Sequence, residues 1–199
     1  MTTLPSQPAP APLSPEQLIE LEKAKLRAKK IRRAAGVALT DGFITGFFAA
    51  TALLCGFSDL SAPLLGLAMG FSAYYSFRCA ARLKQFDLSA PRRLAWNQVF
   101  LFTAITLYAL YNWRFGTLVQ EAQQHIGDPA QLRDMPEVAE RIQLIVKWIP
   151  TMLYGGLIVG TFLGQGFAAL YYFTRQGLLR TYIESTPPWI LELQRRGLA

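Results

Sequence analysis

The sequence is poor in the side chains that most often bind metals or carry catalysis. It has one histidine, His125, and two cysteines, Cys55 and Cys79. Zinc sites need three or four ligands at suitable spacing, and haem proteins commonly use histidine as an iron ligand. Glu121 and Asp128 flank His125 without a distinctive ligand spacing. We therefore expect no metal site, no haem and no other cofactor.

The few cysteines and the pattern of the glycines exclude further chemistry. Neither cysteine lies in a CxxC or CxxCH motif, which argues against redox activity and haem attachment. The glycines of GGLIVGTFLGQG repeat every four residues, a helical period that differs from a phosphate-binding loop. No histidine lies in an apolar run, so a nucleophile and base for intramembrane proteolysis are missing. We expect a protein that is not an enzyme.

Charge is also scarce, because charged residues make up 17% of the chain against roughly 25% in soluble domains. Long apolar runs separate the charged segments. About 20 residues of helix cross a hydrocarbon core roughly 30 Å thick. The sequence predicts an all-α integral membrane protein with four transmembrane helices within residues 34–174. The predicted spans cover residues 34–57, 63–81, 96–113 and 148–173.

The segments around the spans have their own patterns. Residues 1–13 are rich in proline and alanine and predict a disordered tail. Residues 14–33 predict a basic amphipathic helix, whose start is marked by Ser14 as a cap and by Gln17 three residues later. Residues 114–147 form an external loop, and 175–199 a tail with a short interfacial helix beginning at Trp189.

The basic residues predict the orientation of the spans. Of the 20 lysines and arginines, 16 lie in the N-terminal segment, in the connection between the second and third spans counted together with Arg78 near the end of the second span, and in the C-terminal tail. Positive residues are enriched in cytoplasmic loops, so both termini are predicted to be cytoplasmic, in an inner or plasma membrane. This pattern accounts for the net charge of +7 without a nucleic-acid partner. Residues 23–33 are expected to meet anionic lipid headgroups.

Small residues at four-residue spacing mark three spans as closely packed helices. Without a hydrophobic drive between helices in lipid, association depends on close backbone contact. The predicted packing glycines are Gly42, Gly46, Gly66, Gly70, Gly156, Gly160 and Gly164. In an antiparallel hairpin of the first two spans, Gly46 faces Ala73 and Ala49 faces Gly70. In the last span, leucine at Gly160 is expected to disturb the bundle, and leucine at Gly155 only an external contact.

Each span also carries a polar residue at a similar depth, which predicts an intramembrane polar layer. It consists of Asp41, Arg78, Thr103 and Gln165. A charge inside the bilayer is costly, so Arg78 is expected to pair with Asp41. The layer has two interpretations. In the structural one it fixes the register of the bundle; in the functional one Asp41 binds a proton or cation on a path lined by Gln165 and Thr103.

The favoured function is that of a small accessory, assembly or scaffold subunit without enzymatic activity. Its partners would be other membrane proteins or further copies of itself, contacted through the glycine-ridged helices. The alternative is a homo-oligomeric channel or ion- or proton-coupled transporter that uses Asp41 and Gln165. A partner protein on purification would favour the first function, and a pure homo-oligomer that moves an ion would favour the second.

Overall fold

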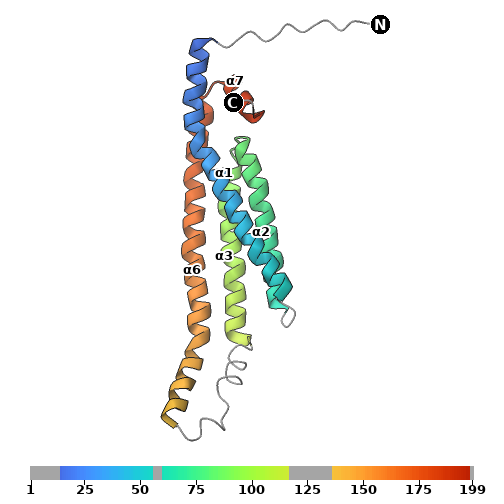
Figure 1. The fold of residues 1–199 in the computed structure, drawn as a ribbon, viewed down its shortest axis with the longest axis vertical. Coiled ribbons are helices and arrows are strands. Elements are labelled where there is room, and N and C mark those ends of the chain that lie inside the picture. Colours follow the sequence, from blue (N-terminus) through green and yellow to red (C-terminus); the bar gives the residue numbers. More distant parts are fainter. Residues whose placement is uncertain (1–13, 56–59, 117–135, 198–199) are drawn as a thin grey trace, which may run out of the picture.

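A computed structural model describes residues 14–55, 60–116 and 136–197, and these residues form helices without any strand. Figure 1 shows the helices running side by side along one long axis. The described helices are α1 (Pro15–Cys55), α2 (Ser61–Lys84), α3 (Ala90–Phe115), α6 (Pro136–Ser185) and α7 (Pro188–Arg195). His125 lies outside the described residues, as do the proposed tail 1–13 and most of the loop 114–147.

Three helices, α1, α3 and α6, are long and apolar enough to cross a membrane. Much of their apolar surface is not covered by the rest of the chain: the exposed fraction is 69% for Phe47, 73% for Met152 and 68% for Phe167. Soluble monomers rarely expose such a continuous apolar surface. The all-α prediction is thus confirmed for the described residues, and three candidate spans are found where the sequence predicted four.

Two of the helices are much longer than a bilayer is thick. α1 has 41 residues and α6 has 50, or about 60 Å and 75 Å at the helical rise. The predicted start of α1 is confirmed, since the Gln17 backbone N–H donates to Ser14 Oγ at 3.3 Å and the Ser14 N–H donates to Gln17 Oε1 at 3.0 Å. The basic helix 14–33 and the first predicted span therefore form one continuous helix.

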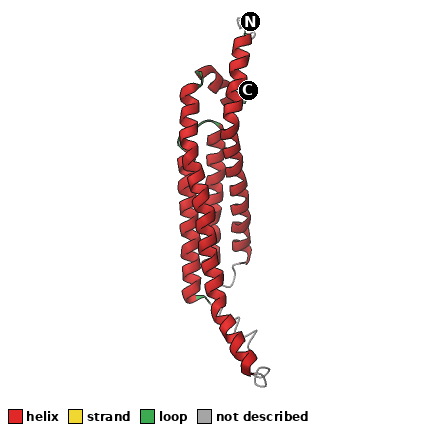
Figure 2. Ribbon diagram, turned by 90° about the vertical axis from the view of Figure 1, so that its left-hand side faces the viewer, coloured by secondary structure: helices red, strands yellow, loops and turns green. Residues whose placement is uncertain are grey.

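The helices pack as neighbouring antiparallel pairs. α1 lies against α2, α2 against α3, and α3 against α6, while α1 and α6 have few contacts. Figure 1 shows α1 crossing beside α6 at one end and leaning away from it toward the other, where α1 meets α2. The start of α1, the α2–α3 connection and α7 all lie at the same end of the bundle (Figures 1 and 2). We call it the terminal end.

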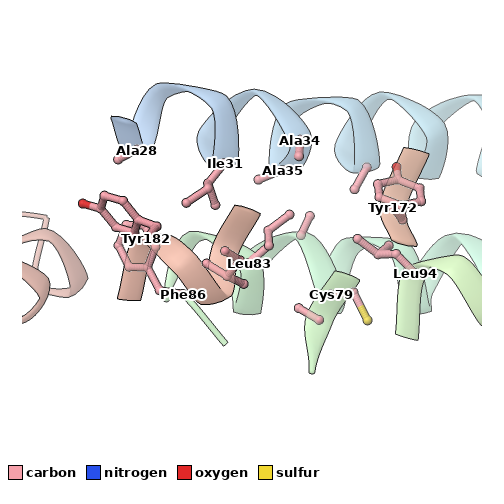
Figure 3. Packing of buried hydrophobic residues seen from close by; sticks show 14 of the residues in the cluster. Ala28, Ile31, Ala34, Ala35, Cys79, Leu83, Phe86, Leu94, Tyr172 and Tyr182 are labelled. Atoms are coloured by element: carbon pink, nitrogen blue, oxygen red, sulfur yellow. The ribbon is translucent and has the colours of Figure 1, made fainter. Parts of the chain in front are cut away.

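The main core lies toward this terminal end and combines small and large side chains. Alanines at helical spacing on α1, among them Ala28 and Ala35, are completely buried. Figure 3 shows this alanine face against Leu83, Phe86 and Tyr182 from α2, the connection and α6. Because alanine has so short a side chain, the neighbouring elements approach the α1 backbone closely. The terminal parts of α1 and α6 are therefore held in the bundle by packing.

The turn from α2 to α3 is tight and tied by a carboxylate. Phe86 has a φ of 60°, unusual for a bulky residue, and its ring is only 2% exposed. Asp87 Oδ1 accepts hydrogen bonds from the backbone N–H (2.9 Å) and hydroxyl (2.8 Å) of Ser89. The hydrogen bond from the Ser89 backbone N–H is the main reason that the pKa of the Asp87 carboxyl lies below its usual value. The Ser89 hydroxyl and the positive charges of Arg82 and Arg93 also stabilise the ionised carboxylate.

The short C-terminal helix packs on the protein, which differs from the predicted position along the headgroups. In α7, Ile190, Leu191 and Gln194 are buried. The Tyr182 hydroxyl donates to Gln194 Oε1 at 2.6 Å, and Arg195 Nε donates to the Gln85 carbonyl at 3.1 Å. The apolar face that predicted a lipid contact thus closes the terminal end of the bundle.

Pro150 lies inside α6, and a proline at such a position is expected to kink or restart a helix. α6 continues through it from Pro136 to Ser185. Figure 2 shows the lower part of this helix turned away from the axis of its long straight section. A proline removes one helical hydrogen bond and commonly bends a helix without ending it in a membrane.

Candidate functional site

Half-buried Asp41 is the centre of a polar cluster that joins three helices. Its Oδ2 atom accepts a hydrogen bond from Gln98 Nε2 of α3 at 2.7 Å and one from Ser76 Oγ of α2 at 3.4 Å. Gln98 is completely buried, and Ser76 is 1% exposed. A carboxylate in apolar surroundings is costly unless donors surround it, and these two donors lower that cost.

Asn97 extends the cluster on the side of α2. Its Nδ2 atom donates to Ser76 Oγ at 3.0 Å and to the Ser72 carbonyl at 3.1 Å. Asn97 and Gln98 are adjacent on α3 and point about 100° apart around the helix, so one reaches α2 and the other α1. Two consecutive amides thus tie α3 to both α2 and α1 at one level.

A second polar contact links α2 and α3 near the opposite end. Asn112 Nδ2 donates to Ser61 Oγ at 3.1 Å and to the Tyr108 carbonyl in its own helix at 3.0 Å. Asn112 is 8% exposed. Inside an apolar bundle, polar side chains must find their partners at defined positions, so the two sets of bonds specify the register of α2 against α3.

The structure does not pair Asp41 with Arg78. The ion pairs among the described residues are Arg180–Glu184 and Arg196–Glu192. Arg78 is exposed, and its guanidinium carbon lies 5.8 Å from the centre of the Tyr74 ring. The reason is helical geometry, because Arg78 follows the inward-facing Ser76 by two residues and so points about 200° around α2.

The predicted role of Thr103 in the layer is not seen either. Thr103 is exposed, and its hydroxyl donates to the Val99 carbonyl of its own helix at 2.9 Å. The polar groups that α3 does contribute, Asn97 and Gln98, follow directly after Trp96. Because the predicted span begins at residue 96, the sequence pattern puts both amides at the membrane interface, where polar side chains are common. The Asn-Gln pair at the start of an apolar run was the available signal.

Gln165 lies on α6 and shares a cavity with Asp41. Its Oε1 atom is buried and has no hydrogen-bond partner in the described part of the chain. The hydroxyl of Tyr172, also on α6, is likewise buried without a partner, and it lies within electrostatic reach of Asp41. The structure therefore brings together two of the four predicted residues, Asp41 and Gln165.

The glycines of α1 and α2 lie in the contact between these helices. A methyl carbon added to Gly46 would lie 3.6 Å from Ala73 Cβ, and one on Gly70 would lie 3.9 Å from Ala49 Cβ. A carbon on Gly66 would come within 2.8 Å of Leu53 Cγ. On Gly42 it would lie 3.1 Å from the Phe77 ring. Gly46 and Gly70 are thus opposite the alanines that the hairpin register predicts.

The glycines of α6 have a different environment. Added methyl carbons on Gly155, Gly156, Gly160 and Gly164 would meet no atom of the described chain within 4 Å. An added methyl carbon at Gly160 thus meets as much open space as one at Gly155, so the described chain shows no contact that would make leucine at Gly160 the more disturbing of the two. Gly156, Gly160 and Gly164 are exposed along one side of the helix. We call this the outer glycine face of α6.

The fold and the polar cluster define a class: a helical protein with three helices long and apolar enough to cross a membrane, in which buried Ser76, Asn97 and Gln98 join α1, α2 and α3. No group of three or more metal-ligating side chains occurs in the described ranges. Comparisons of the chain with family models, curated proteins and solved structures find no match. Its function is therefore inferred from its own geometry.

Proposed function

We propose that the chain is a four-span membrane protein and that α2 is the fourth span. α2 has 24 residues, about 36 Å of helix, which exceeds a hydrocarbon core of roughly 30 Å. It packs against both α1 and α3, which are candidate spans themselves. Ser72 and Ser76 are buried, and Asn97 donates to the Ser72 backbone carbonyl and to the Ser76 hydroxyl. The modest hydropathy of α2 therefore arises partly from two serine side chains that are buried inside the bundle and do not contact lipid.

In this topology the terminal end of the bundle lies in the cytoplasm. The segments that carry 16 of the 20 lysines and arginines belong to the helix ends and connections at that end (Figure 1). The seven basic side chains between Lys23 and Arg33 are all exposed. We propose that they attract the anionic headgroups of the cytoplasmic leaflet.

The function that the geometry supports best is that of a non-enzymatic accessory, assembly or scaffold subunit. The observation that carries it is the outer glycine face of α6, which has no contact within the described chain. Gly42 and Gly66, in contrast, are used in the contact between α1 and α2. Small residues let helix backbones approach closely in lipid, so an open glycine face fits a helix of another protein.

A second candidate, a homo-oligomeric channel or ion- or proton-coupled transporter, is favoured by another observation. Asp41 and Gln165 line one cavity, and no basic side chain neutralises Asp41 among the described residues. A bundle of four helices leaves little space for a pore through its own centre. Transport would therefore require several copies of the chain.

The two functions are distinguished by affinity purification in a mild detergent followed by mass spectrometry. We expect the wild-type chain to retain a different membrane protein and Gly160→Leu to lose it. Gly177→Leu is the matched control, because Gly177 lies on the same helix with equally open space but beyond the predicted span. Recovery of a pure homo-oligomer without a partner would contradict the first function.

A further inference from the structure

A cavity of about 530 Å³ lies between α1, α2, α3 and α6. Its lining is mostly apolar and includes Ile44 and Phe48 of α1, Ile105 of α3 and Leu157 of α6. Ile44 and Phe48 are also more than half exposed, so the cavity opens sideways through the surface of α1. Its volume is in the range of roughly 300–1,000 Å³ typical of small-molecule sites. A ligand dissolved in the bilayer would reach it without crossing water.

One end of this cavity is polar and rich in hydrogen-bond acceptors. Asp41 of α1 and Gln165 of α6 line the cavity there. Gln165 Oε1 is buried without a donor, and within the described residues no lysine or arginine forms an ion pair with Asp41. The hydrogen bonds to Asp41 from Gln98 and Ser76 both reach its Oδ2 atom. A ligand that donates hydrogen bonds and carries positive charge complements this end.

We propose that the cavity binds a membrane-soluble aliphatic amine, with its ammonium group at Asp41 and Gln165 and its hydrocarbon chain along the apolar walls. The lining on α1 extends from Asp41 to Ala52, about 16 Å at the helical rise, which gives room for a linear chain. This inference does not depend on the outer glycine face of α6.

Other small ligands fit the cavity less well. A proton or a small metal cation would balance the carboxylate and leave the apolar length of the cavity unfilled. A fatty acid would fill that length but bring a second negative charge to Asp41, which is unfavourable in a medium of low dielectric constant. An alcohol of the same length would donate one hydrogen bond without neutralising the charge.

The first test compares three ligands of equal chain length, dodecylamine, dodecanol and dodecanoate. The full chain is placed in phosphatidylcholine nanodiscs, and the shift of its thermal unfolding midpoint is followed against ligand concentration. We expect dodecylamine to bind at least tenfold more tightly than the other two. Equal shifts for amine and carboxylate, or the same stabilisation by sodium chloride alone, would overturn the proposal.

Variants of the two polar lining residues test whether the ammonium group binds at Asp41 and Gln165. Asp41→Asn should weaken dodecylamine binding at least tenfold and Gln165→Leu severalfold. Thr103→Val is the matched control, because its exposed hydroxyl bonds within its own helix. Unchanged binding by a folded Asp41→Asn protein would refute the site.

A measurement on the wild-type chain covers the case in which a variant fails to fold. A photoreactive aliphatic amine with its reactive group at the chain end should label the lower cavity wall near Ala52 and Ala62. Labelling spread evenly over the exposed apolar surface, without competition by dodecylamine, would also overturn the proposal.

Discussion

Asp41 illustrates, at the scale of single residues, how a carboxylate is kept inside an apolar bundle. The sequence singles it out as the one acidic residue well inside a predicted span. It does not identify the partners, because an arginine at similar depth was the obvious counter-charge. Two residues along a helix amount to about 200° of rotation, so on α2 Ser76 faces Asp41 and Arg78 points away from it. The second donor, Gln98, comes from α3.

Replacing Asp41 should destabilise the protein according to what the new side chain offers Gln98. Asp41→Ala leaves the buried Gln98 amide without its acceptor, which costs about 1–3 kcal/mol in the free energy of unfolding. Asp41→Asn retains an oxygen acceptor and should cost less. Denaturant unfolding in detergent, followed by circular dichroism, measures both. Thr103→Val should be close to neutral, and an Asp41→Ala protein as stable as this control would contradict the assigned contact.

Asp87 predicts a dependence of stability on pH. Its pKa in the folded chain lies below the ordinary carboxyl value of 3.8, chiefly because the Ser89 backbone N–H binds the charged form. Because the Asp87 pKa is lower in the folded chain than its ordinary value, the charged carboxyl stabilises the fold at pH values above the ordinary pKa. This stabilisation is lost as the pH falls through the lowered pKa of the folded chain. The thermal unfolding midpoint should therefore fall less on acidification in Asp87→Asn than in the wild type. Identical profiles would exclude this contribution.

The helices show which parts of the fold follow from local pattern. Apolar length predicted α1, α3 and α6 as membrane helices, and a hairpin register predicted the pairs Gly46–Ala73 and Gly70–Ala49. Packing between distant elements was not predictable in the same way. The apolar face of α7 suits lipid and protein equally by sequence, and only the proximity of Tyr182 and Phe86 decides for protein.

The glycines of α2 and α6 should respond in opposite ways to a larger side chain. A leucine at Gly66 would overlap Leu53 and approach the α1 backbone at Ala49. Gly66→Leu should therefore lower the free energy of unfolding by about 1–3 kcal/mol. Gly160→Leu meets open space and should leave the unfolding of the isolated chain unchanged. Thermal unfolding of both variants in detergent makes the comparison. Equal destabilisation by the two would show that α6 packs inward at Gly160.

The attachment of α7 should depend in part on the hydroxyl group of Tyr182. Tyr182 OH donates to Gln194 Oε1 and lies 3.4 Å from the Ala24 carbonyl, so it joins α7, α6 and α1. Tyr182→Phe leaves the buried Gln194 amide unpaired, at a cost of about 1–3 kcal/mol. Limited proteolysis should cut the C-terminal segment faster in this variant. Cleavage at the wild-type rate would show that apolar packing alone holds α7.

At the scale of the whole molecule, α1 and α6 extend the bundle beyond the thickness of a bilayer. Their terminal parts form a helical core with the α2–α3 connection and α7 (Figure 3). In the proposed topology this core stands in the cytoplasm beside the headgroups, and the outer glycine face of α6 lies in the lipid. The protein thus offers a fixed body on one side of the membrane and an open helix face within it, which suits an assembly subunit.

Photo-crosslinking inside native membranes tests this account most directly. A photoreactive amino acid at Leu163, beside the outer glycine face, is compared with one at Phe47 of α1; both side chains are exposed. We predict a discrete adduct with another membrane protein from Leu163, lost on adding Gly160→Leu, and lipid adducts alone from Phe47. Lipid adducts alone from both positions would contradict the proposed partner contact.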